Sequence, residues 1–197
     1  MMANFDALRA LAIETVQSPR TAARSIMGLH LSREVLWTGL VLAGAVNTII
    51  YSFSLLMTDT SMLPALFRNP LMFFMLITGL LAVTVHAFYW TGRALGGQGD
   101  LGELLALLVW LQGLRAVAQA VMVVLLLVSP VLGQLFSLVV GILGLWITVN
   151  FVAEALRLPS LFHALGVLLV AAVGMVLGLV ILAGLIGISA MGVPASV

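Results

Sequence analysis

Residues 104–128 read LLALLVWLQGLRAVAQAVMVVLLLV, an apolar run interrupted by one charge, Arg115. Four more apolar runs occupy residues 35–57, 70–91, 132–152 and 162–188, and each has the roughly 20 residues that a helix needs to cross a bilayer. Hydrophobic residues make up 63% of the chain and charged residues 8%, whereas a soluble domain is about half apolar and about a quarter charged. The sequence therefore predicts an all-α, polytopic membrane protein, a bundle of five transmembrane helices.

The segment before the first span predicts two short amphipathic helices. One covers residues 5–17, with Phe5, Leu8 and Val16 on one face. The next begins at Ser18-Pro19, because proline is favoured at the first helical position. Both could lie in the membrane interface, or both could pack on the bundle as a hairpin. We divide the chain into cytoplasmic or interfacial helices at 1–34, a membrane domain at 35–190 and a short extracytoplasmic tail at 191–197.

The arginines are distributed unevenly between the two sides of the predicted bundle. Only Arg68 falls on one side, and the other side collects Arg9, Arg20, Arg24, Arg33, Arg93 and Arg157. Loops rich in arginine stay in the cytoplasm. We therefore expect a protein of the cell (inner) membrane with a cytoplasmic N-terminus and an extracytoplasmic C-terminus.

Arg115 is the candidate functional residue, because it lies about 16 Å into its span and an arginine at that depth costs about 2.5 to 3.5 kcal/mol. Helical side chains lean toward their own N-terminus, which points Arg115 toward the cytoplasmic half of the other spans. The polar residues that could join it are Gln112, Gln119, Asn47, His86, Asn150 and Glu154. They predict either a polar cavity that binds an anion, a lipid headgroup or a partner, or an interhelical hydrogen-bond cluster that holds the bundle together.

Two small-residue patterns predict close helix packing. They are Gly174-x-x-x-Gly178 in the fifth span and Ser137-x-x-x-Gly141 in the fourth. Small residues at this spacing let helix backbones approach each other. The contact could lie within the bundle or between two copies of the chain.

No pattern for catalysis or metal binding is present. The chain has no cysteine, no H-E-x-x-H pair and no G-x-S-x-G elbow. Gly96-Gly97-Gln98-Gly99 lacks the Lys-Ser/Thr ending of a phosphate loop, so we interpret it as a flexible connector. A net charge of +1 gives no reason to expect a nucleic-acid partner. We predict no enzyme, no metal and no cofactor.

Three short patches carry a family resemblance. They are Ser18-Pro19-Arg20, residues 95–105 (LGGQGDLGELL) and residues 155–164 (ALRLPSLFHA). With their order and spacing, the chain resembles the Yip domain family, five-span membrane proteins named for interaction with Ypt/Rab GTPases, over about Ser18 to Ile188. The resemblance implies a non-enzymatic role in membrane organisation or trafficking. The long acidic cytosolic tail of eukaryotic members is absent, so GTPase binding is not expected.

These observations leave alternative functions. The first is a scaffold or adaptor that contacts membrane lipids, other membrane proteins or a second copy of itself. The second is a small permease or channel lined by Arg115, Gln112, Gln119 and Asn47. The third is an intramembrane enzyme, for which no catalytic set of residues is visible.

Overall fold

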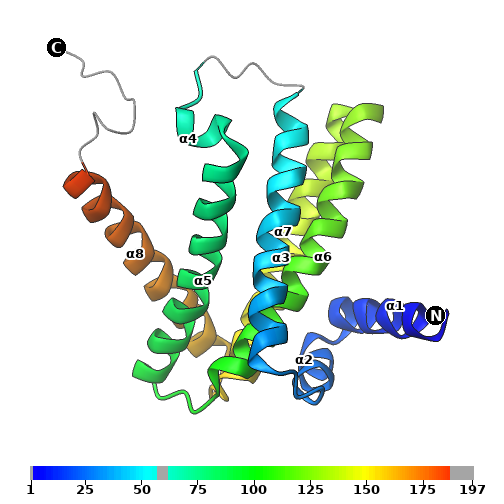
Figure 1. Cartoon of the computed structure of the whole chain (residues 1–197). Helices are drawn as coiled ribbons and strands as arrows, with labels where there is room; N and C mark the ends of the chain where they lie inside the picture. Colours follow the sequence, from blue (N-terminus) through cyan, green and yellow to red (C-terminus); the bar gives the residue numbers. More distant parts are fainter. Residues whose placement is uncertain (1, 57–61, 187–197) are drawn as a thin grey trace.

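The computed structural model describes residues 2–56 and 62–186, and within them every regular element is a helix (Figure 1). The helices are α1 (Met2–Gln17), α2 (Pro19–Met27), α3 (Arg33–Leu55), α4 (Ala65–Arg68), α5 (Pro70–Ala94), α6 (Leu101–Val128), α7 (Pro130–Ala155) and α8 (Leu161–Ile186). Five of them, α3, α5, α6, α7 and α8, are long and apolar enough to cross a membrane. The prediction of an all-α bundle with five transmembrane helices is confirmed.

Local capping interactions fix where the spanning helices begin. Asn69 Oδ1 accepts hydrogen bonds from the backbone N–H groups of Leu71 and Met72, at 2.9 and 3.2 Å, at the start of α5. Asp100 Oδ2 accepts one from Gly102 N at 2.7 Å at the start of α6. These bonds satisfy backbone donors that the first helical turn leaves without a partner. As a result α6 begins earlier than the apolar run at 104–128 predicts.

Helices α6 and α7 form a tight antiparallel hairpin, because only Ser129 separates them. Ser129 has an extended backbone, with φ −159° and ψ 121°, and Pro130 starts the next helix. Proline suits the first helical position because its missing N–H would have no helical partner there. Helices α1, α2, α3, α5 and α8 all contact this hairpin.

The buried core lies at one end of the bundle. The fully buried Leu104 and Leu107 are in the first turns of α6, and the fully buried Phe151 and Val152 are in the last turns of α7. On α8 the buried residues end at Ala171, and the helix then leaves the others (Figure 1). This end also holds the α2–α3, α5–α6 and α7–α8 loops, and we call it the arginine-rich end.

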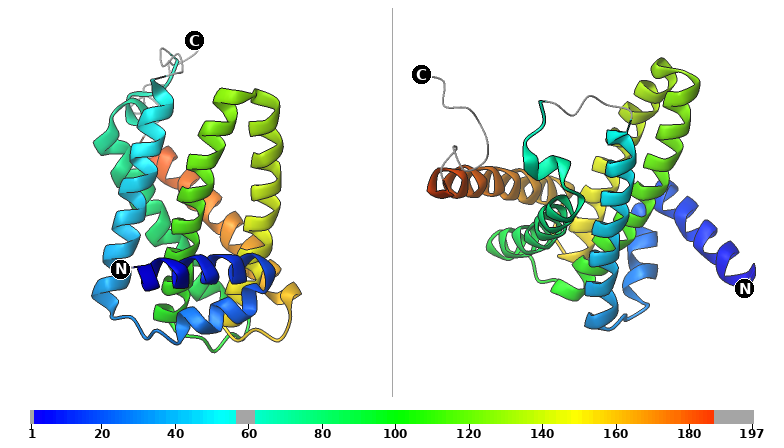
Figure 2. Two further views of the ribbon diagram at one scale, coloured as in Figure 1. Left: turned by 90° about the vertical axis from the view of Figure 1, so that its right-hand side faces the viewer. Right: turned by 45° about the horizontal axis from the view of Figure 1, so that its top comes forward.

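The two N-terminal helices lie across the hairpin near the arginine-rich end (Figure 2). Helix α2 packs against α6 and α7 with Ala22, Ala23 and Ile26 buried. Helix α1 instead leaves the apolar side chains of Phe5 and Leu8 exposed, at 70% and 53%. Helix α2 therefore packs on the bundle, which was one of the two alternatives predicted for this segment. Helix α1 instead has the exposed apolar face that is expected of a helix in the membrane interface. Helix α1 begins at Met2, three residues before the predicted start.

Candidate functional site

The glycine-rich turn between α5 and α6 is packed against the end of α7. Gly97 N donates to Gly92 O at 2.8 Å, and Gln98 N donates to Leu156 O at 2.9 Å. A Cβ at Gly99 would collide with the carbonyl oxygen of Ala155 and would come within 2.6 Å of Leu156 Cα. The interpretation of residues 96–99 as a flexible connector is therefore wrong, because tertiary contacts hold the turn in place.

Arg157 ties the two turns of the arginine-rich end together. Its Nη2 donates to Glu103 Oε1 and Oε2 at 3.0 and 3.2 Å, and its Nη1 donates to Gln98 O at 3.5 Å. The backbone of Arg157 is left-handed, with φ 52°. This conformation is uncommon for a residue with a Cβ, and it ends α7 so that Leu158 N can donate to Ala153 O at 2.9 Å.

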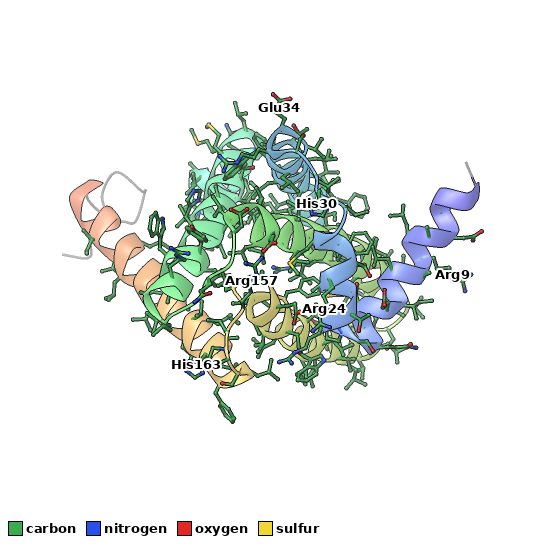
Figure 3. All side chains as sticks on the ribbon, turned by 90° about the horizontal axis from the view of Figure 1, so that it is seen from below. Arg9, Arg24, His30, Glu34, Arg157 and His163 are labelled. Carbon is green, nitrogen blue, oxygen red and sulfur yellow. The ribbon has the colours of Figure 1, made fainter. Side chains whose placement is uncertain are left out.

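Sequence reasoning did not assign roles to Glu103 and Arg157. Both lie within the patches that carry the family resemblance, residues 95–105 and 155–164. The sequence signal that could have indicated their ion pair was the presence of opposite charges, Glu103 and Arg157, near two turns at the same end of the bundle. Figure 3 looks onto this end and shows Arg157 near its centre.

A second ion pair joins α2 to α7. Arg24 Nε donates to Glu154 Oε1 at 2.6 Å, across 130 positions of sequence. The hydrogen bond and the charge of Glu154 raise the pKa of Arg24 above its ordinary value. Arg24 is largely exposed, so the pair fixes the orientation of α2 more than it adds stability.

The polar residues predicted to gather around Arg115 have other partners. Asn47 Nδ2 donates to Ala43 O and Asn150 Nδ2 to Trp146 O, both at 2.8 Å. The ring of His86 stacks on Trp37, with centroids 5.8 Å apart. Side-chain bonds to the carbonyl four residues earlier satisfy a polar group within its own helix. The predicted convergence of these three residues and Glu154 on Arg115 is therefore not what the structure shows.

Arg115 and Gln119 instead line a groove between α6 and α7, which has a volume of about 980 Å³ and reaches α1 between Arg9 and Gln17. Arg115 is exposed and has no ion pair with any described residue. The Oε1 atom of Gln119 is buried and accepts no hydrogen bond from the described part of the chain. Gln112, Asn47, His86, Asn150 and Glu154 do not line this groove.

Within the described part of the chain, the glycines of the small-residue patterns make no close contact with another helix. Ser137 and Gly141 are exposed on α7 and line the groove. Gly174 and Gly178 are exposed on α8, although Met175 between them accepts a hydrogen bond from Thr84 Oγ1 of α5 at 3.5 Å. A Cβ added at Gly141, Gly174 or Gly178 would meet no atom within 4 Å. Packing within the bundle is thus wrong for both patterns, and a contact between two copies stays a prediction.

A hydrogen bond joins α1 to α6 at the end of the groove that is nearer to the start of α6. Trp110 Nε1 donates to Thr15 Oγ1 at 3.0 Å, and Thr15 Oγ1 donates to Leu11 O at 2.8 Å. Thr15 is fully buried although threonine is polar. The hydrogen bond between Trp110 and Thr15 therefore fixes the position along α6 at which α1 crosses the α6–α7 hairpin.

We expect Thr15→Val to lower the free energy of unfolding by about 1 kcal/mol, because the indole N–H loses its acceptor. It should also loosen α1, which limited proteolysis within residues 2–17 would detect as faster cleavage. Thr38→Val on the exposed face of α3 is the matched control, since no hydrogen bond of Thr38 is found in the described structure. Equal stability and equal cleavage of the two variants would contradict the role of Thr15.

Comparison with known proteins gives one match. The family model described as the Yip1 domain matches residues 13–185, from the end of α1 to the last turn of α8. Comparisons with curated proteins and with solved structures found no significant match. The matched residues include the glycine-rich turn, Glu103 and Arg157, and they confirm the resemblance inferred from the three sequence patches. The chain is therefore an integral membrane protein that belongs to the Yip1 domain family.

Proposed function

We propose that this protein is a non-enzymatic scaffold or adaptor of the cell's inner membrane that presents helix α2 on its cytoplasmic face. The observation that carries the proposal is the one-sided burial of α2. Ala22, Ala23 and Ile26 pack on α6 and α7, while Arg20 and Ser25 face outward on the same helix. A short helix held rigidly with a free polar face can bind a partner without a large loss of conformational entropy.

The orientation follows from the distribution of charge. The arginines of α2, the loop arginine Arg157 and the terminal arginines of α3 and α5 all belong to the arginine-rich end. Positively charged segments next to membrane spans remain in the cytoplasm. This rule supports a cytoplasmic location for the outward face of α2 and the two tied turns.

The permease function has less support. It requires Arg115, Gln112, Gln119 and Asn47 to line one passage, and the groove contains only Arg115 and Gln119. The side-chain amide of Asn47 donates a hydrogen bond to Ala43 O within α3. A role in binding proteins or lipids fits the described surfaces better than solute transport does.

Site-specific photo-crosslinking in living cells tests the scaffold function. We expect a benzophenone amino acid at Arg20 to give discrete protein adducts, because this position faces outward from a fixed helix. The same probe at Leu138, an exposed position of α7 within its span, should give lipid adducts without discrete protein bands. If Arg20 gives no protein adduct that Leu138 lacks, the scaffold proposal fails.

A further inference from the structure

We propose that the groove between α6 and α7 is a binding site for one anionic phospholipid, whose phosphate is held by Arg115 and Arg9. Both arginines line the groove, the first from α6 and the second from α1. The site is distinct from the outward face of α2, on which the scaffold function rests. One function can therefore fail while the other stands.

Charge is the first argument for this occupant. No acidic side chain of the described residues lines the groove, and neither arginine has an ion pair there. An arginine within a membrane span needs a counter-charge or water. A phosphate supplies the counter-charge, and the planar guanidinium can hold two of its oxygens at once.

The walls of the groove argue for a lipid rather than a free anion. They are mostly apolar, and one side of α7 presents small residues at a helical spacing: Ser137, Gly141, Gly144 and Thr148. These residues leave room for a hydrocarbon chain beside the helix backbone. The α6 wall runs from Leu111 to Met122, which is about 16 Å at 1.5 Å per residue. That length is close to half of a hydrocarbon core of about 30 Å, which is enough to hold much of one acyl chain.

Helix α1 places the headgroup. Its exposed Phe5 and Leu8, together with Ile13 and Val16 farther along the helix, are apolar side chains suited to the boundary between headgroups and acyl chains. Arg115 lies five residues beyond Trp110, which bonds α1, and its side chain leans back toward the start of α6. The guanidinium is thereby directed to the depth of α1 and Arg9, where a phosphate would sit in the leaflet next to the arginine-rich end.

Gln119 adds a polar side chain to the wall of the groove, one helical turn beyond Arg115 on α6. Its Oε1 is buried and has no donor among the described residues. A buried acceptor without a donor is uncommon in a finished structure. With Arg115, Gln119 makes this part of the α6 wall polar.

Lipid retention measures the site directly. The full chain is incorporated into equimolar vesicles of phosphatidylglycerol and phosphatidylcholine, extracted in mild detergent and analysed by native mass spectrometry. We expect the protein to retain phosphatidylglycerol in preference to phosphatidylcholine. Arg115→Gln should lower the retained phosphatidylglycerol about tenfold, a loss typical of one charge-assisted contact. Arg93→Gln removes the same charge outside the groove and should retain the lipid as the unchanged protein does.

A second pair of variants tests the acyl-chain part without changing charge. Gly141→Leu fills the groove, and Gly174→Leu makes the same change on α8, where a side chain also meets no atom within 4 Å. We expect only the first to lose lipid, which decides the matter even if Arg115→Gln does not fold. Equal retention by Gly141→Leu and Gly174→Leu would overturn the proposal. A lipid-free dimer that only the groove variants disrupt would also overturn it, because a second copy would then occupy the groove.

Discussion

Gly99→Ala is expected to lower the free energy of unfolding by more than about 3 kcal/mol, the upper range for forcing extra atoms into a packed site. The added methyl would collide with the carbonyl oxygen of Ala155 and the Cα of Leu156. Both are backbone atoms, so neither can move aside by changing a rotamer. Any shift of the turn would also weaken the bond from Gln98 N to Leu156 O.

Thermal unfolding of the purified protein in detergent measures this loss. Gly113→Ala is the matched control, because a Cβ at Gly113 on α6 would meet no atom within 4 Å. Alanine is favoured over glycine inside a helix by about 0.5–1 kcal/mol. The control should therefore unfold at the same temperature as the unchanged protein or slightly higher. Equal unfolding temperatures for Gly99→Ala and Gly113→Ala would show that the turn is not held as described.

Phe151→Ala should produce a loss of about 3–5 kcal/mol, the usual cost of truncating a buried phenylalanine. Phe151 is 0% exposed and is the largest of the fully buried side chains. It lies where α7 meets the first turns of α6. The vacated space can be filled only by moving two helices that the salt bridges and turns of this end hold together.

Denaturant titration in micelles separates this effect from a general loss of apolar surface. Phe162→Ala removes the same atoms from α8, but Phe162 is 83% exposed. The free energy of unfolding of the Phe162→Ala variant should differ from that of the unchanged protein by no more than about 0.5 kcal/mol. A loss at Phe162 as large as the loss at Phe151 would contradict a core confined to the arginine-rich end.

The membrane architecture was predictable because its cause is local. A run of about 20 apolar residues has no stable alternative to a helix in hydrocarbon, so the five spans followed from composition and length. The helix ends were less accurate. Asp100 caps α6 before the apolar run starts, and the short helix α4 at Ala65–Arg68 forms between the first two apolar runs, where no helix was predicted.

The candidate site was only partly predictable because it depends on which helix faces meet. The helical repeat places Arg115 and Gln119 on one face, and both line the groove. Partners on other helices depend on the rotation and tilt of each span, which one sequence does not reveal. Glu154 therefore pairs with Arg24 rather than facing Arg115. The glycine-rich turn was also misjudged, because glycine permits both flexibility and close contact. Which of the two applies depends on the helices that the turn meets.

The contact between α2 and the α6–α7 hairpin has a consequence for biosynthesis. Helix α2 is made early, yet its buried face and its partner Glu154 are separated by 130 positions of sequence. The face formed by Ala22, Ala23 and Ile26 cannot be fully covered until the ribosome has produced the first four spans. Since chain elongation proceeds at about 5–20 residues per second, this interval lasts several seconds. The nascent chain therefore carries an undocked N-terminal segment until α7 is made. Insertion of α7 is the step that completes the surface on which α2 packs.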